Sequence, residues 1–401
     1  MTALVVQGDA AHLPLPDASV DLICTSPPYF GLRSYTDGGV HYSGQIGSEA
    51  TPAEFLEALW TCTHEWTRVL KPSGSIWVNL GDKYDSGTNS PRKNGGDRLA
   101  DGRERQAWNT CKGGPERATI GRAKSLMGLP WRYALGCIDD LGLILRAEVI
   151  WSKPNGLPES VTDRVRRSHE QWFHFTRELH YFSAVDEIRE PHTGHRGNDA
   201  KQSRSSNNGD THRALARDES LFNPLGKLPG SVWTIPSEPL SVPDSLDVDH
   251  FAAFPTEWPR RIIQGWSPSG ICTTCGEGRR PVGISTITGD RGGRKFNVCD
   301  GKVGMLGRER EYAILGYACA CPIPDAPTRP SVVVDPFGGT GTTALCASVL
   351  GRAGVSVDLS YDYGRLARWR TTDPGQRAKA SRLTKPPVEL DGLGDLFGGA
   401  A

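Results

Sequence analysis

The chain has 401 residues, 37% of them hydrophobic and 23% charged, which is enough for one large globular domain or two. Its 46 basic and 46 acidic residues cancel, so no global positive field marks it as a nucleic-acid-binding protein, and any such binding must come from local patches. No apolar run approaches membrane-spanning length and residues 1–11 do not form a signal peptide, so we expect a cytoplasmic protein that does not enter a membrane.

Two short strands are predicted near the N-terminus. The first, Ala3–Val6, leads into Gly8-Asp9, which by itself is a plain turn at a strand end. The second, Val20–Cys24, is followed by Thr25-Ser26-Pro27-Pro28-Tyr29. The two prolines fix φ and force an extended segment, so its backbone carbonyls cannot join a helix. This segment is either a rigid loop or a site of chemistry.

A helix, a strand and a polar loop follow. Residues 49–70 are predicted to form a helix that begins at Thr51-Pro52 and carries an apolar face, and residues 75–80 a buried strand. Residues 83–124 are rich in glycine, asparagine, arginine and lysine. Such a basic loop either becomes ordered on DNA or is a solvated insertion, and the acidic residues within it dilute its charge.

The middle of the chain combines regular elements with a polar interval. A helix is predicted over residues 125–141 and a strand over residues 143–151. At the end of that strand, Lys153 and Asn155 either contact a bound base or phosphate or form a polar turn. Residues 191–235 are polar, and their arginine, lysine and asparagine side chains suit the reading of base edges.

Ten cysteines are present, and in a reducing compartment they favour buried thiols or metal ligands over disulfides. Two close pairs, Cys272-x-x-Cys275 and Cys319-x-Cys321, lie between residues 271 and 322. Four thiolates suit a tetrahedral structural zinc ion, with Cys299 as a spare ligand, whereas the alternative is free thiols in a long loop. Because four thiolates leave no open position, such a zinc ion would not be catalytic.

The C-terminal part contains the pattern around which the chain is organised. Val332–Val334 is predicted to be a strand, Asp335 begins a glycine-rich turn, and Thr342–Leu350 is predicted to be a helix. Glycines let a ligand approach the backbone, and the amides at a helix start favour an anionic group. The next strand, Gly354–Val357, ends in Asp358, a residue type that accepts hydrogen bonds from ribose hydroxyls in this position.

Two motifs together resemble those of the DNA amino-methyltransferases, which use S-adenosylmethionine. They are Thr25-Ser26-Pro27-Pro28-Tyr29 and Asp335-Pro336-Phe337-Gly338-Gly339-Thr340-Gly341-Thr342. Their order, with the catalytic-type motif first and the cofactor-type motif last, is similar to the permuted beta arrangement of that family. The resemblance covers roughly two thirds of the chain and leaves out the basic loop, the polar interval and the cysteine-rich segment.

The resemblance implies a role for each of these residues. The catalytic residues would be Ser26, Pro27, Pro28 and Tyr29. Cofactor contacts are expected at both ends of the chain. Asp9 would accept from the adenine amino group, and Phe251 and Ala252 would lie beside the methionine part. The remaining contacts would come from Asp358 and from the turn residues Asp335, Phe337, Gly338, Gly339, Thr340, Gly341 and Thr342.

The chemistry of an exocyclic amino group explains why such a motif suits methyl transfer. The amino nitrogen of cytosine or adenine is a poor nucleophile because its lone pair is delocalised into the ring. It improves when acceptors hold both N–H groups, and the Ser26 oxygen and the Pro27 carbonyl can supply that pair. Tyr29 would stack on a base that has left the double helix. No protein nucleophile or catalytic metal is needed, because the sulfonium methyl group is already activated.

We therefore expect an α/β fold with a Rossmann-like, doubly wound mixed sheet and helices on both faces, of the class I methyltransferase type. Residues 1–190, 236–270 and 331–371 would form the catalytic domain, with the basic loop at 83–124. Residues 191–235 would be a target-recognition region, residues 271–322 a zinc-ribbon-like insertion, and residues 372–401 a flexible tail.

The expected reaction is methylation of cytosine N4 in duplex DNA within a restriction-modification system, with a cognate restriction endonuclease as a candidate partner. In the resembled family, Ser-Pro-Pro-Tyr is more typical of cytosine N4 enzymes and Asp-Pro-Pro-Tyr of adenine N6 enzymes, so adenine N6 is the alternative target. The alternatives of other classes are a DNA-binding module that has lost catalysis and an enzyme that methylates RNA or protein. The recognition sequence and the oligomeric state are left open.

Overall fold

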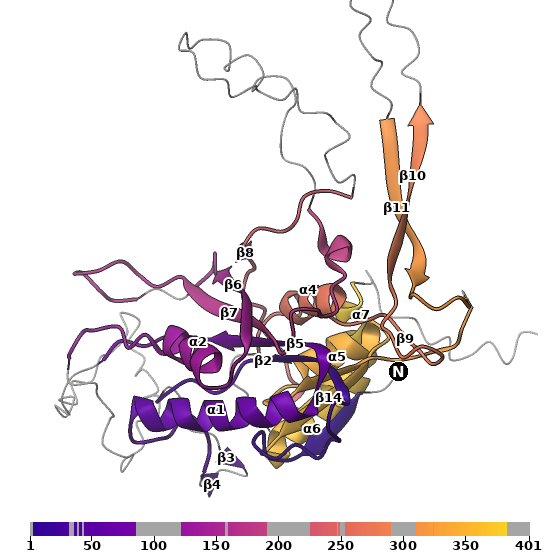
Figure 1. Ribbon diagram of the computed structural model, residues 1–401. Helices are drawn as coiled ribbons and strands as arrows, with labels where there is room; N and C mark the ends of the chain where they lie inside the picture. The colour runs from indigo at the N-terminus through magenta and orange to yellow at the C-terminus, as the bar shows by residue number, and fades with distance from the viewer. Residues whose placement is uncertain are drawn as a thin grey trace, which may run out of the picture. The chain divides into compact units, whose positions relative to one another are not determined.

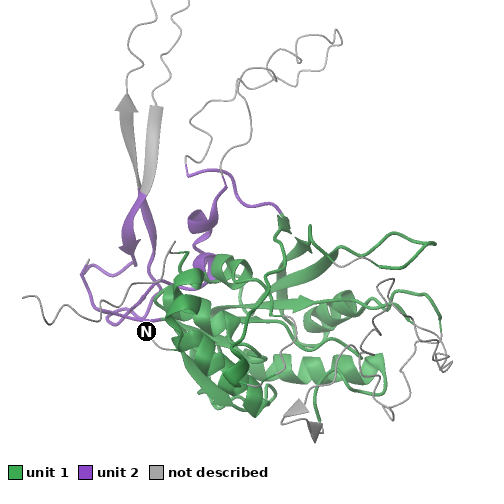
Figure 2. Cartoon of the chain, turned by 180° about the vertical axis from the view of Figure 1, so that it is seen from behind, with its two compact units in different colours: residues 1–182, 231–263, 331–401 green, residues 183–230, 264–330 purple. Residues whose placement is uncertain are grey.

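The structure is a computed structural model (Figure 1). It describes residues 3–31, 36–37, 40–41, 44–85, 122–156, 159–190, 225–246, 248, 253–289, 309–323 and 325–382. The chain divides into two compact units (Figure 2). The first unit comprises residues 1–182, 231–263 and 331–401, and the second unit comprises residues 183–230 and 264–330.

An eight-stranded mixed sheet is the centre of the first unit. Its strands are β1 (Leu4–Gln7), β2 (Val20–Thr25), β5 (Leu70–Leu80), β6 (Ile144–Ser152), β7 (His169–Thr176), β8 (Val232–Thr234), β13 (Val332–Asp335) and β14 (Ala353–Asp358). The order is β1-β14-β13-β2-β5-β7-β6-β8. Neighbours are parallel from β1 to β5, β7 is antiparallel to β5 and β6, and β8 is parallel to β6. This confirms the expected mixed sheet, completed by strands from both ends of the chain.

Helices cover both faces of this sheet. They are α1 (Pro52–Val69), α2 (Leu129–Asp139), α4 (Glu257–Trp266), α5 (Thr342–Val349), α6 (Tyr361–Thr372) and α7 (Pro374–Ala380). Side chains alternate along a strand, so Val355 of β14 packs in the same core as Trp66 of α1, whereas its neighbour Gly354 faces the opposite side. There a Cβ added to Gly354 would be 2.5 Å from the carbonyl oxygen of Ala344, so α5 packs directly on the strand. No helix that the structure describes has both the length and the apolarity needed to cross a lipid bilayer.

The start of α1 shows why the helix begins where the sequence predicts. Thr51 Oγ1 accepts a hydrogen bond from the Glu54 backbone N–H at 3.2 Å, and the Glu54 carboxylate accepts one from the Thr51 N–H at 3.0 Å. Pro52 follows at the first helical position, where no backbone N–H is needed. The helix gives way directly to β5 at Leu70, five residues earlier than the predicted strand.

The second unit contains two small sheets. One pairs β9 (Ile271–Cys272) with β12 (Thr328–Arg329), and the other is a long antiparallel hairpin of β10 (Arg280–Gly289) and β11 (Glu309–Ala318) (Figure 1). The sequence predicted a zinc-ribbon-like insertion over residues 271–322, and its low apolar content gave no signal for a long hairpin. Shorter elements of the chain are β3 (Thr36–Asp37), β4 (Val40–His41) and the 3₁₀ turns η1 (Val185–Ile188) and η3 (Asp244–Leu246).

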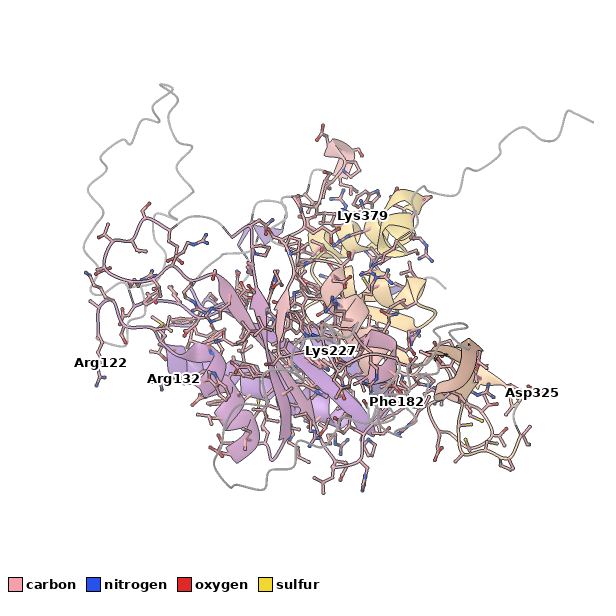
Figure 3. All side chains as sticks on the ribbon, turned by 90° about the horizontal axis from the view of Figure 1, so that it is seen from above. Arg122, Arg132, Phe182, Lys227, Asp325 and Lys379 are labelled. Atoms are coloured by element: carbon pink, nitrogen blue, oxygen red, sulfur yellow. The ribbon has the colours of Figure 1, made fainter. Side chains whose placement is uncertain are left out.

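Two stretches differ from the predicted division of the chain. Residues 191–235 are predicted to read the target, but Val232–Thr234 is β8 of the central sheet, and Trp233 is buried there. Residues 372–401 are predicted to be a flexible tail, but 374–380 form α7. Asp373 caps this helix by accepting from the Gln376 N–H at 2.8 Å. Lys379, labelled on the helix in Figure 3, pairs with Glu238 at 2.7 Å. Residues 86–121, 191–224 and 383–401, which belong to the predicted basic loop, target-recognition region and tail, lie outside the described residues.

Candidate active site

The predicted motifs lie at one edge of the central sheet. Because β1, β14, β13, β2 and β5 are parallel, their carboxyl ends meet there. Residues 26–29 follow β2, Asp335 ends β13, Asp358 ends β14, and Gly8-Asp9 follow β1. Residues 310 positions apart are in direct contact at this edge, because the Thr25 hydroxyl donates to the Asp335 carboxylate at 2.7 Å.

Asp335 is buried and connects the two motifs through hydrogen bonds. Its side chain is 1% exposed, and it accepts hydrogen bonds from the hydroxyls of Thr25 and Thr343 at 2.7 and 2.9 Å and from the Phe337 N–H at 3.2 Å. Burial raises the pKa of Asp335 to about 6 in spite of these donors. The carboxylate therefore joins the end of β2 to the start of α5, and it is not among the residues that line the neighbouring pocket.

The glycine-rich turn is held by Asp358. The carboxylate of Asp358 accepts from the N–H groups of Gly339 and Ser360 at 2.8 and 2.9 Å. Gly339 and Gly341 have φ of +48° and +75°, values that favour glycine. The turn thus places Gly339 and the tip of β14 side by side, as a strand-turn-helix unit for a ligand requires.

A pocket of about 520 Å³, including its open mouth, lies between the two motifs. It is lined by Gly8, Asp9, Ala10, Pro28, Gly44, Gln45, Ile46, Pro336, Phe337, Asp358, Leu359 and Tyr363. Two carboxylates are present, and no lysine or arginine is among these described residues. The pocket therefore favours a ligand with hydrogen-bond donors or positive charge and an apolar ring over a phosphate.

Asp9 is held in its ionised form at the rim of the pocket. Partial burial raises the pKa of Asp9, but hydrogen bonds from the Ala11 N–H at 2.9 Å and from His12 at 3.0 Å outweigh it and lower the pKa below its usual value. A carboxylate in this state can accept a hydrogen bond from an amino group.

The Ser26 and Tyr29 side chains meet on Asn79, a buried residue of β5. The Ser26 hydroxyl donates to Asn79 Oδ1 at 3.2 Å, and the Tyr29 hydroxyl lies 2.7 Å from the same oxygen. Asn79 Nδ2 donates to the Gln171 carbonyl at 3.1 Å, which fixes the orientation of the amide. Because Ser26 uses its one hydrogen on Asn79, its lone pairs are left to accept hydrogen bonds from another group.

An ion pair extends this network across the sheet. The Tyr29 hydroxyl also lies 2.8 Å from Glu170 Oε2, and the other carboxylate oxygen of Glu170 pairs with Lys153. Lys153 in turn lies over the ring of Trp151, 4.1 Å from its centroid. Of the two predicted residues in this turn, Lys153 therefore belongs to the network, whereas Asn155 bonds the backbone of Ser237 and forms a polar turn.

Asn79 and Glu170 were missed by the sequence analysis. An asparagine within the otherwise apolar end of β5 is a signal that could have identified the first. Glu170 had no signal of its own, because only the antiparallel pairing of β5 and β7 brings it to Tyr29. The predicted cofactor residues Phe251 and Ala252 lie outside the described residues.

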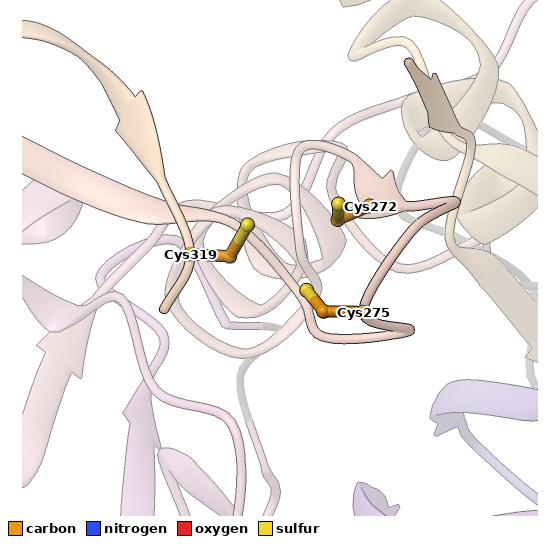
Figure 4. A group of neighbouring side chains, drawn as sticks. All are labelled: Cys272, Cys275 and Cys319. Carbon is orange, nitrogen blue, oxygen red and sulfur yellow. The ribbon is translucent and has the colours of Figure 1, made fainter. Parts of the chain in front are cut away.

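A second cluster of functional side chains lies in the second unit. Cys272, Cys275 and Cys319 point toward one another, and their Sγ atoms all lie within 4.8 Å of one another (Figure 4). Hydrogen bonds from the backbone N–H of Cys275 and of Thr274 lower the pKa of the Cys272 thiol below its usual value. Cys321 is partly exposed and is not part of this group, and Cys299 lies outside the described residues.

Comparison with known proteins gives matches to a protein family and to individual proteins. The sequence model of the DNA methylase family matches residues 20–272. Type II methyltransferase M.XycI of Xanthomonas campestris pv. cyanopsidis is 41% identical over 193 residues, which are 47% of this chain and 59% of that protein. Type II methyltransferase M.SmaI of Serratia marcescens is 28% identical over 368 residues, 91% of this chain and 89% of that protein. The chain thus matches less than two thirds of the length of M.XycI and most of the length of M.SmaI.

A solved structure supports the fold independently. The structure named PvuII DNA methyltransferase (cytosine-N4-specific) matches with a TM-score of 0.52 and 16% identity, over 96% of this chain and 91% of that one. At this identity the likeness shows a shared fold.

Proposed function

This chain belongs to the DNA methylase family, whose sequence model covers more than half of it, and on that premise we propose that it transfers a methyl group from S-adenosylmethionine to cytosine N4 in duplex DNA. The observation that carries the proposal is the meeting of two distant motifs at one sheet edge. Pro28 of the first motif and Phe337 of the second line the same pocket, and Ser26 and Tyr29 follow the strand beside it.

The pocket suits S-adenosylmethionine, which carries a sulfonium group, an ammonium group, ribose hydroxyls and an adenine ring. Asp358 would accept from the ribose hydroxyls and Asp9 from the adenine amino group, while Ile46, Phe337 and Leu359 offer apolar surface to the ring. When bound, S-adenosylmethionine supplies a methyl group that is already electrophilic, so a nitrogen lone pair is sufficient for the reaction.

The Ser-Pro-Pro-Tyr segment would prepare that lone pair. The Ser26 oxygen and the Pro27 carbonyl would each accept an N–H hydrogen of the target amine, which draws the nitrogen toward tetrahedral geometry. Asn79 is a positioning residue, because the hydrogen bond that it accepts from Ser26 leaves the serine lone pairs available to the amine. The nitrogen–methyl bond would form as the sulfur–methyl bond breaks, so that S-adenosylhomocysteine leaves. The nitrogen would then release one of the two hydrogens held by Ser26 and Pro27 to water as a proton.

The preference for cytosine rests on Ser26. In the family that the motifs resemble, serine at this position is more typical of cytosine N4 enzymes and aspartate of adenine N6 enzymes. Both amines offer the same hydrogens to the same acceptors, so the choice between them depends on how the base fits. A cognate restriction endonuclease is part of the proposal, because methylation at one DNA sequence protects that sequence from such a nuclease.

The decisive experiment measures which polymer and which base receive the methyl group. The full-length protein is incubated with isotope-labelled S-adenosylmethionine and mixed plasmid DNA, and the nucleosides are analysed by mass spectrometry. We expect labelled N4-methylcytosine. N6-methyladenine would overturn the choice of base, and label in added RNA or protein alone would overturn DNA as substrate. Cofactor binding with no labelled product would indicate a DNA-binding module without catalysis.

Sequencing around the modified base would give the recognition site. Methylation scattered over unrelated sequences would overturn the proposal that a restriction endonuclease of the same specificity is a partner.

Two variants test the roles of the side chains. Ser26→Ala should lower turnover at least 100-fold, which corresponds to about 2.7 kcal/mol, while the affinity for S-adenosylhomocysteine stays the same. Asn79→Ala should lower turnover about tenfold, because the Ser26 hydroxyl is then free to rotate. Ser19→Ala, at the opposite end of β2, is the matched control and should leave turnover unchanged. Full activity of Ser26→Ala would refute the assignment of its hydroxyl.

A further inference from the structure

We propose that the second unit binds one structural zinc ion through Cys272, Cys275 and Cys319, with Cys321 as the fourth ligand, and that this ion fixes the root of the β10–β11 hairpin. This site is independent of the proposed methyl transfer.

The geometry of the three sulfurs carries the proposal. A zinc–sulfur bond of about 2.3 Å places the thiolates of a tetrahedral site about 3.8 Å apart. The three Sγ atoms already lie within 4.8 Å of one another, so small side-chain rotations bring them to that spacing (Figure 4). A disulfide would use two of these sulfurs and leave the third beside them, whereas one zinc ion uses all three.

The first cysteine pair lies in a tight turn that suits a metal. Cys272 ends β9, and its carbonyl accepts from the Gly276 N–H at 2.9 Å. Gly276 has φ of +77°, which lets the chain turn back directly after Cys275.

The second pair lies at the end of the hairpin. The first residue pair of the hairpin is Arg280 with Ala318, and Cys319 follows immediately. The turn of the first pair is tied to the chain after the hairpin, because Cys272 pairs with Thr328 and the Thr273 N–H donates to the Pro327 carbonyl at 2.9 Å. An ion held by both pairs would therefore close the hairpin at its base.

Apolar burial around this cluster is too small to replace a metal. Among the side chains that the structure describes near it, Ile271 and Ala326 are buried, whereas four large apolar side chains are exposed: Val282, Leu315, Tyr317 and Ile323. A structural zinc ion contributes about 10–16 kcal/mol in small peptides, which compensates for a missing core.

Cys321 completes the site by its position in the sequence. It is two residues after Cys319 and partly exposed, in a loop that is not part of a strand or helix. Four thiolates make a closed structural site, whereas three thiolates and a water would leave an open one.

The first test measures metal content in the full-length protein purified under reducing conditions. We expect one zinc ion per chain by elemental mass spectrometry, and at least a 100-fold loss of zinc affinity in Cys272→Ser and in Cys319→Ser. Cys137→Ala, a buried cysteine of the first unit, should retain the ion. Absence of zinc from the reduced wild-type protein after incubation with zinc chloride would overturn the proposal, and so would full occupancy in the Cys272→Ser/Cys319→Ser double variant.

The second test needs no variant that might fold poorly. Chelation of the wild-type protein should raise hydrogen exchange in residues 280–289 and 309–318, and added zinc chloride should restore protection. Unchanged exchange after complete metal removal would refute the role at the hairpin root. Cobalt substitution checks the fourth ligand: the thiolate-to-cobalt charge-transfer band should weaken in Cys321→Ser, and an identical spectrum would exclude Cys321. None of these readouts depends on methyl transfer.

Discussion

At the scale of single residues, the aromatic cluster of the central sheet holds a histidine in its neutral form. The ring of His174 stacks on Trp77 at 4.6 Å, and its Nε2 lies 3.0 Å from the Ser75 hydroxyl. Burial, with a smaller effect of Arg146, lowers the pKa of His174 to about 3. Between that pH and about 6.5, the unfolded chain therefore binds a proton that the folded protein does not.

This histidine predicts how stability depends on pH. The contribution of His174 to the free energy of unfolding should fall by about 1.4 kcal/mol for each pH unit below about pH 6. His174→Gln, which keeps a donor for Ser75, should lack this fall. The difference in stability between the wild type and the variant, measured by urea unfolding at pH 6, 5 and 4, should therefore shrink steadily. A constant difference for His174→Gln would contradict the neutral buried ring.

The titration of Asp335 changes the free energy of unfolding with pH in the opposite direction to that of His174. Because burial raises its folded pKa from 3.8 to about 6, the folded state binds a proton in this window that the unfolded state has released. The stabilisation of the folded state by this proton is therefore present at low pH and is lost as the pH rises toward 6. The two groups partly cancel in the wild type, and this is why the test above compares variants at each pH.

At the scale of elements, the junction between the glycine-rich turn and β14 depends on the absence of one carbon atom. A Cβ added to Gly338 would lie 1.9 Å from Ser356 Oγ and 3.0 Å from its Cβ. The Ser356 hydroxyl is buried, and its oxygen has no hydrogen-bond partner among the described residues, so it contributes little that would be lost on removal.

A double-mutant cycle at this junction follows from the geometry. Gly338→Ala should destabilise the protein by about 1–3 kcal/mol, because the extra carbon forces β14 and the turn apart. Ser356→Ala alone should be nearly neutral, and in the double variant it should recover about 1 kcal/mol. Gly316→Ala in β11, where an added Cβ meets no atom within 4 Å, is the control and should change stability by less than about 0.5 kcal/mol. Additive effects in the cycle, measured by denaturant unfolding, would show that the two residues do not clash.

At the scale of the whole molecule, one pocket is built from both ends of the chain. Asp9 and Pro28 come from the N-terminal part and Phe337 and Asp358 from the C-terminal part, and the hydrogen bond between Thr25 and Asp335 joins the two. Neither end can form this pocket alone.

A ligand of the pocket should therefore protect both ends together. S-adenosylhomocysteine at 100 times its dissociation constant should stabilise the protein by about 2.7 kcal/mol. It should also slow hydrogen exchange in residues 8–10, 336–341 and 358–360 at the same ligand concentration. The hairpin residues 280–289 are the internal control and should not change. Protection of only the C-terminal segments would contradict a pocket shared between the two motifs.

The sequence by itself determined those features that depend on local chemistry. Capping by Thr51 and Pro52, alternation or runs of apolar residues, and the glycine-rich turn predicted α1, β2, β13 and α5, because each signal acts over a few neighbouring residues. The spacing of Cys272 and Cys275 likewise predicted a cluster, and Cys319 lies beside them.

Only the tertiary structure decided which distant groups meet. The sequence could not place Glu170 beside Tyr29 or Asn79 beneath Ser26, because these contacts depend on the order and register of β2, β5 and β7 in the sheet. It also could not distinguish the buried link made by Asp335 from the ligand-facing position of Asp358, since both are aspartates at the ends of parallel strands. Thr25 of β2 and Thr343 of α5 cover the carboxylate of Asp335, whereas Asp358 lines the pocket.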